Sequence, residues 1–74
     1  MPRLYSAKII LSALQRAGFI IVSQKGSHIK LSKSQRRKSF TVIVPNHKEI
    51  AMGTFFSILR QADMTKKELE KFIK

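Results

Sequence analysis

The chain has 74 residues, which suffices for one domain with a thin hydrophobic core. Its 15 lysine and arginine residues against 4 acidic residues give a net charge of +11, which favours a polyanionic partner, with nucleic acid as the first candidate. A basic surface without a specific partner is the alternative. The lack of cysteine excludes disulfides and thiolate metal sites. Because no apolar run is long enough to cross a bilayer, no membrane partner is expected.

The first predicted element is an amphipathic helix between Ser6 and Gly18. Ser6 is a typical N-cap residue, and Gly18 is typical of the left-handed position that follows a helix. Apolar residues recur between them at spacings of three and four, which predicts one buried stripe. The stripe comprises Ala7, Ile10, Leu11, Leu14 and Ala17. We expect this helix to serve in packing.

Three short strands are expected next, over residues 20–22, 28–32 and 40–44. The first two are joined by a tight turn at Gly26, because glycine tolerates the positive φ that such hairpins need. Residues 33–39 are polar throughout and predict an exposed, mobile, basic hairpin loop. Hairpin connections make the sheet an antiparallel meander.

Two helices are predicted after the third strand, which Pro45 ends. Thr54 is expected to be the N-cap of the longer helix. Its buried face is expected to comprise Phe55, Ile58, Leu59 and Ala62. Thr65 and Glu68 form a capping-box pattern, which predicts a short last helix from about Lys66.

This order predicts one α+β domain over residues 1–74. Its α-β-β-β-α order gives a three-stranded antiparallel sheet, followed by a short C-terminal helix. An antiparallel sheet can keep one face in water while helices cover the other. We therefore expect the helices on one face of the sheet and a free face for a ligand.

His28 is the first candidate for a catalytic residue. It follows the turn at Gly26 and Ser27, and strand alternation directs it to the open face together with Lys30. Imidazole accepts or donates a proton near neutral pH. A base at this position can activate the 2′-OH of RNA to attack the adjacent phosphate, and this reaction needs no metal. Ser27 as a nucleophile lacks an orienting acid, so we expect it to serve as an N–H donor or a phosphate contact instead.

Basic residues near His28 are expected to bind RNA phosphates. They are Lys25, Lys30, Lys33, Arg36, Arg37 and Lys38. His47 and Lys48 are candidates for a second acid–base group or a phosphate contact, with a plain surface role as the alternative. The four carboxylates are dispersed, whereas a two-metal nuclease gathers its carboxylates at one site. No metal or other cofactor is therefore expected.

Several motifs, in this order, resemble the HicA toxin family. They are Ala17-Gly18-Phe19, Gly26-Ser27-His28, Val44-Pro45-Asn46-His47, Gly53-Thr54 and Ile58-Leu59-Arg60-Gln61-Ala62. The resemblance implies a double-stranded-RNA-binding-domain-like fold and a translation-independent mRNA endonuclease, the toxin of a type II toxin–antitoxin pair. It also implies His28 as the catalytic histidine, a HicB-type acidic antitoxin that masks the active site, and a prokaryotic cytoplasmic location.

Two other functions fit the charge and the fold. A small RNA- or DNA-binding module without catalysis needs only positive charge at position 28. An adaptor for one acidic protein does not explain the histidine beside the glycine turn. The sequence therefore favours a metal-independent endoribonuclease with His28 as the acid/base.

Overall fold

The computed structural model describes residues 4–73. The elements are α1 (Ala7–Arg16), β1 (Ile20–Lys25), β2 (His28–Gln35), β3 (Lys38–Pro45), α2 (Met52–Ala62) and α3 (Lys66–Glu70). The three strands form one antiparallel sheet in the order β1-β2-β3. The structure thus confirms the predicted α+β, double-stranded-RNA-binding-domain-like fold with a short C-terminal helix.

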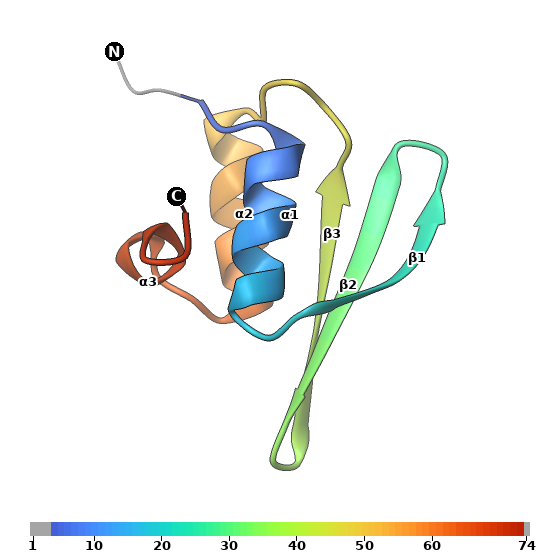
Figure 1. The fold of residues 1–74 in the computed structure, drawn as a ribbon, viewed down its shortest axis with the longest axis vertical. Coiled ribbons are helices and arrows are strands. Elements are labelled where there is room, and N and C mark those ends of the chain that lie inside the picture. The colour runs from blue at the N-terminus through green and yellow to red at the C-terminus, as the bar shows by residue number, and fades with distance from the viewer. Residues whose placement is uncertain (1–3, 74) are drawn as a thin grey trace.

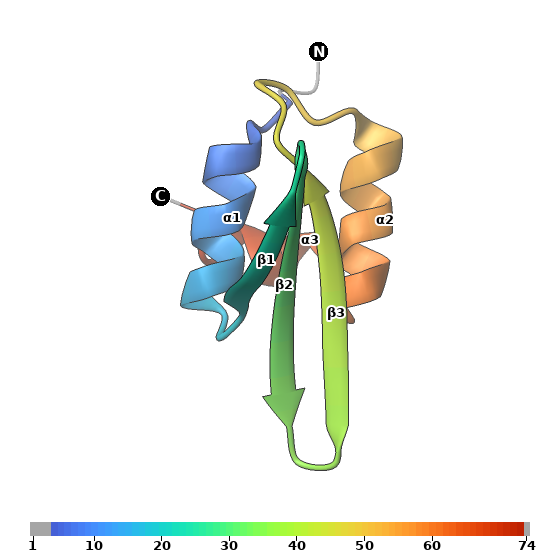
Figure 2. The same cartoon turned by 90° about the vertical axis from the view of Figure 1, so that its right-hand side faces the viewer.

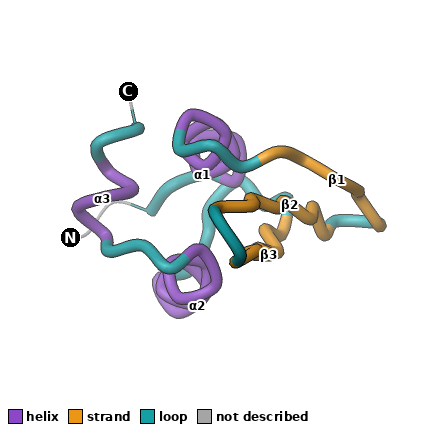
Figure 3. Tube along the Cα trace, turned by 90° about the horizontal axis from the view of Figure 1, so that it is seen from below, coloured by secondary structure: helices purple, strands orange, loops and turns teal. Residues whose placement is uncertain are grey.

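The elements form layers. Helices α1 and α2 cover one face of the sheet, and α3 lies on the side of these helices away from the sheet (Figure 1, Figure 3). No helix within residues 4–73 covers the opposite face, which is turned toward the viewer in Figure 2. The hairpin of β2 and β3 extends well beyond the ends of the helices (Figure 2). The expected free sheet face is therefore present.

Alternation along the strands separates the core from the open face. Ile29 and Leu31 of β2 and Val42 and Val44 of β3 are at most 5% exposed, while their neighbours in the strands are exposed or half-buried. Every second residue points to the same side of a strand. The buried set packs against helix residues that include Ile10, Leu14, Phe55 and Ile58. The helices therefore fix which side chains of β2 and β3 face solvent.

Both ends of α1 form as predicted. The Ser6 hydroxyl accepts a hydrogen bond from a first-turn N–H at 3.2 Å. At the other end, Gly18 adopts a φ of 107°. Its N–H donates to the Gln15 carbonyl at 3.1 Å, and the Phe19 N–H donates to the Leu14 carbonyl at 2.9 Å. These two bonds define a Schellman motif, in which the buried Phe19 directs the chain into β1.

The predicted start of α2 is wrong. The N-cap is Ala51, without a side-chain cap, and Thr54 lies inside the first turn. A tertiary contact sets the start of this helix instead, because the buried Ile50 donates its N–H to the Tyr5 carbonyl at 2.7 Å. The backbone before α2 is thereby fixed to the segment before α1.

Helix α3 begins at the predicted capping box. The Glu68 N–H donates to the Thr65 hydroxyl at 3.1 Å, and the Thr65 N–H donates to the Glu68 carboxylate at 2.8 Å. The hydrogen bonds from Thr65, the backbone one foremost, hold the pKa of Glu68 below its ordinary value. Leu69 is fully buried and anchors this short helix to the core.

The prediction of a mobile basic loop over residues 33–39 is wrong. Strand β2 continues to Gln35 and β3 begins at Lys38, so that only Arg36 and Arg37 form the turn. Here the hairpin extends past the helices (Figure 1). A strand that covers no core needs no apolar face. The outer part of the hairpin is therefore polar although its two strands pair regularly.

Candidate active site

A tight turn places His28 at the start of β2. Lys25 pairs with His28 across Gly26 and Ser27. Gly26 has a φ of 59°, in the left-handed region that favours glycine, and a Cβ atom there would meet nothing within 4 Å. The backbone conformation of the turn, rather than close packing, is therefore the reason for a glycine at this position.

His28 is exposed on the sheet face that the helices leave open. Its neighbour Ile29 is buried on the helix side, so His28 points the other way. Lys25 on β1 and Pro45 on β3 are its cross-strand partners, and Lys30 follows two residues later on the same face. The imidazole thus stands among lysines, and neither cross-strand partner is a carboxylate.

The loop after β3 brings His47 to the same end of the molecule. The Asn46 N–H donates to the Ser27 carbonyl at 2.6 Å, and the His47 carbonyl accepts from the Ala7 N–H at 2.9 Å. These backbone bonds join the β1–β2 turn, the loop and the start of α1. A shallow hollow there is lined by Ser6, Lys8, Asn46, His47 and Lys48. Lys8 was not predicted to lie beside His47 and Lys48, because its positive charge is the only feature in the sequence that points to such a place.

The basic turn at Arg36 and Arg37 lies at the other end of the sheet. Strand β2 has eight residues, so its length separates this turn from His28 by about 23 Å. Figure 2 shows the turn at the far tip of the hairpin, beyond all the helices. The structure therefore does not place Arg36, Arg37 or the adjacent Lys38 beside His28.

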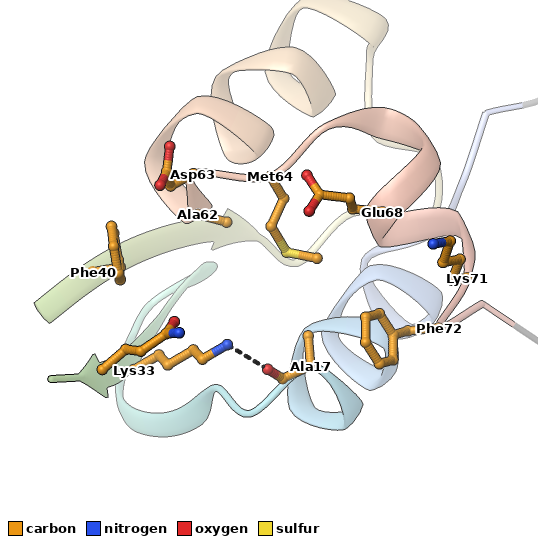
Figure 4. A pocket seen from close by; sticks show the side chains of 10 residues that line it. Ala17, Lys33, Phe40, Ala62, Asp63, Met64, Glu68, Lys71 and Phe72 are labelled. Carbon is orange, nitrogen blue, oxygen red and sulfur yellow. Dashed lines mark hydrogen bonds between the residues drawn. The ribbon is translucent and has the colours of Figure 1, made fainter. Parts of the chain in front are cut away.

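Lys33 is not on the open face. It follows the buried Leu31 by two residues, which directs it to the helix side of β2. Its Nζ donates to the Ala17 carbonyl at 2.8 Å (Figure 4) and lies 5.7 Å from the centre of the Phe19 ring. A cation at a helix C-terminus satisfies a free carbonyl and interacts favourably with the helix dipole. Lys33 therefore stabilises the end of α1.

A second hollow lies beside Lys33, away from the end of the sheet that carries His28. The C-terminal ends of α1 and α2 border it together with α3 and the hairpin. Phe40, Asp63, Met64 and Phe72 are among the side chains around it (Figure 4). Of the predicted site residues, Lys33 alone lines this hollow.

Two of the carboxylates, both in α3, accept hydrogen bonds far from His28. Glu68 belongs to the capping box, and Glu70 accepts a hydrogen bond from the Tyr5 hydroxyl at 3.0 Å. Within residues 4–73, no group of three His, Cys, Asp or Glu side chains is placed to hold a metal ion. The same part of the chain contains no helix that is long and apolar enough to span a membrane.

Together, these features define a small, strongly basic α+β domain with an exposed histidine on an uncovered sheet face. Residues 7–64 match the family described as the HicA toxin of bacterial toxin–antitoxin systems. The chain therefore belongs to the HicA toxin family, and its role is that of the toxin, with an antitoxin as its partner. The match confirms the resemblance drawn from the ordered motifs. No curated protein is matched by this chain.

Proposed function

We propose that this toxin is a metal-independent endoribonuclease that cleaves mRNA, with His28 as the catalytic acid/base. One observation carries the proposal: His28 is exposed on the open sheet face, opposite Lys25 and two residues from Lys30. An anionic backbone is attracted to this face, and the histidine there can exchange a proton with it.

In the proposed reaction, the neutral imidazole of His28 takes the proton of a ribose 2′-OH. The 2′-oxygen attacks the adjacent phosphorus, and the 5′-oxygen leaves with a proton from a second acid or from water. The products are a 2′,3′-cyclic phosphate and a 5′-OH. Lys25 and Lys30 stabilise the charge that develops on the phosphoryl oxygens. His47 and Lys48, at the same end of the molecule, are proposed as the second acid–base group or a phosphate contact.

The RNA is proposed to run along the open face of β2. Lys25 and Lys30 hold the phosphates near His28, with Gly26 and Ser27 close to the backbone of the RNA. The basic hairpin tip, formed by Arg36, Arg37 and Lys38, then makes a second contact further along the RNA. Lys33 has no part in this proposal, because its ammonium group is bonded to Ala17.

The toxin–antitoxin role extends the proposal to a partner and a location. A domain with a charge of +11 is complementary to an acidic inhibitor. We propose a HicB-type acidic antitoxin that covers the face around His28 and thereby keeps RNA away from it. The toxin acts in the prokaryotic cytoplasm, where its mRNA substrate is found.

The test is incubation of the purified protein with a defined RNA in EDTA, followed by analysis of the product ends. Cyclic phosphate ends in EDTA support the proposal, and cleavage only after addition of Mg²⁺ contradicts metal independence. His28→Ala protein, purified in the same way, controls for contaminating ribonucleases. RNA binding without cleavage by the parent favours the second candidate, a non-catalytic RNA- or DNA-binding module.

A further inference from the structure

Strand β1 carries apolar side chains that the described chain leaves about half exposed. All six of its residues are exposed. The exposed fractions of Ile20, Ile21 and Val22 are 63%, 46% and 48%. An edge strand with exposed β-branched residues offers both unpaired backbone groups and apolar surface, and natural sheets avoid this combination at edges that stay free. This edge therefore has the properties of a binding surface.

The opposite edge of the sheet is occupied at one position by a side chain of α2. Gln61 of α2 accepts the outward N–H of Ile43 in β3 with its Oε1 at 2.8 Å. Its Nε2 donates to the Ser57 hydroxyl at 3.2 Å, which holds the amide in this orientation. Among residues 4–73, no side chain makes a comparable bond to the outer edge of β1. At Ile43 the edge of β3 is thus protected by a side chain, whereas the outer edge of β1 has no such protection within residues 4–73.

The pairing of β1 limits what fits there. The register shifts between Ile21 and Ser23, which leaves Val22 in a bulge. A bulge bends the strand, so a short extended segment, rather than a long flat strand, is the form that matches this edge. A run of about five residues would cover the exposed aliphatic side chains.

The charges around β1 indicate the chemistry of the occupant. Lys25 ends the strand that carries the apolar run, and Lys30 stands opposite Ser23. No acidic residue precedes Glu49 in the chain. A second copy of this chain would bring two charges of +11 together, which opposes association. The edge is complementary to an apolar segment with acidic residues at the end that lies near Lys25 and Lys30.

We propose that an extended segment of the antitoxin, apolar along most of its length and acidic at the end near Lys25, adds to the sheet along β1. This inference rests on the proposed acidic antitoxin. Main-chain hydrogen bonds supply affinity in such strand addition, and the alternate side chains supply specificity. Because β1 ends at Lys25, opposite His28, a segment bound there carries the rest of the inhibitor toward the open face. The edge is thus an anchor beside the candidate active site.

A matched pair of variants tests the anchor. Ile20→Glu places a negative charge on the proposed edge, and Ile9→Glu makes the same change on α1, where Ile9 is 39% exposed. Both are made in a His28→Ala background and titrated with the cognate antitoxin of this toxin. We expect Ile20→Glu to weaken binding at least about tenfold, through reduced apolar burial and added repulsion, and Ile9→Glu less than about threefold. Equal binding of the two variants overturns the proposal.

Hydrogen exchange on the parent complex gives a second measurement that depends on no variant. Strand addition slows amide exchange within residues 20–25, and unchanged exchange there overturns the proposal. A toxin dimer in sedimentation that Ile20→Glu dissociates also overturns it, because a second copy would then occupy the edge. Cleavage of RNA by Ile20→Glu protein with His28 intact should match the parent. If the parent protein fails to cleave RNA, the endoribonuclease proposal is wrong. The antitoxin titration of the two variants still decides whether β1 binds the antitoxin.

Discussion

His28 is the residue on which the enzymatic proposal depends. Its side chain is exposed, so His28→Ala leaves no core cavity, and we expect the free energy of unfolding to change by less than about 1 kcal/mol. RNA affinity should persist, because the lysines and arginines supply it. Cleavage should fall roughly 10²–10⁴-fold, the usual contribution of a general base. Cleavage kinetics with a labelled RNA, beside thermal unfolding of the same samples, measure these effects.

A lysine at the same position separates charge from proton transfer. His28→Lys keeps a positive charge there but introduces a group that is mostly protonated at neutral pH, so we expect it to cleave as poorly as the alanine variant. Cleavage at the parental rate would show that the residue at position 28 acts through its charge alone.

Lys30 and Lys33 lie three residues apart on the two faces of β2, and we expect different effects from their replacement. Lys33→Met removes the bond to Ala17 and should lower the free energy of unfolding by about 1–2 kcal/mol, because a helix C-terminus then lacks its charged donor. Lys30→Met should leave stability unchanged and weaken RNA binding. Chemical denaturation and RNA titration of both variants measure the two effects. The same decrease of stability in both would contradict the structural role of Lys33.

Residues that act locally were the ones that sequence reasoning placed correctly. Ser6, Gly18 and Thr65 satisfy backbone groups within their own helix ends, so the signal lies within a few neighbouring residues. The start of α2 depends on a hydrogen bond between Ile50 and Tyr5, distant in sequence, and no local pattern reports it. The sequence did contain a pattern that places Lys33 on the helix side, since Lys33 continues the alternation of Ile29 and Leu31. The polar character of residues 33–39 predicted a loop instead.

Among the elements, the β2–β3 hairpin is expected to contact RNA at its tip. The triple variant Arg36→Gly, Arg37→Ala and Lys38→Ala should bind all RNA sequences more weakly, with a salt slope lower by about 0.7 for each phosphate that the tip no longer binds. Glycine is chosen at position 36 because Arg36 has a φ of 57°, where alanine would be strained. Affinity measured at several salt concentrations gives the slope.

The same variant also tests the separation of binding from chemistry. The length of β2 separates the tip from His28, so the cleavage rate at saturating RNA should remain near that of the parent. An unchanged salt slope would remove the tip from the binding surface. A much lower cleavage rate at saturation would show that the tip positions the RNA for reaction.

At the scale of the whole molecule, the net charge of +11 should govern how fast the antitoxin binds. Electrostatic attraction raises association rates above about 10⁶ M⁻¹s⁻¹ at low salt, and ions screen it over about 10 Å at 0.1 M. We therefore expect the association rate to fall steeply between low and physiological salt, with a smaller change in dissociation. Stopped-flow mixing at several salt concentrations measures both rates. A salt-independent association rate would contradict electrostatic attraction between the partners.

The general plan of the molecule was predictable because its parts are short and joined in sequence. Hairpin turns dictate an antiparallel meander, and the apolar stripe of α1 must face the sheet. The candidate site was harder to predict, since its parts come together across the chain. His28 was identified by its turn, but its proximity to the loop that carries His47 depends on the bond between Asn46 and Ser27.

The block that Gln61 places on β3 has a consequence for stoichiometry. A sheet with two free edges can accept a neighbour on each side, and repetition of that pairing builds filaments. A sheet with one free edge accepts one strand, and the pairing cannot repeat. The bond from Ile43 to Gln61 therefore opposes repeated pairing along the middle of β3 and favours a single added strand at β1. Pairing along this part of β3 would first require the amide of Gln61 to leave the backbone of Ile43.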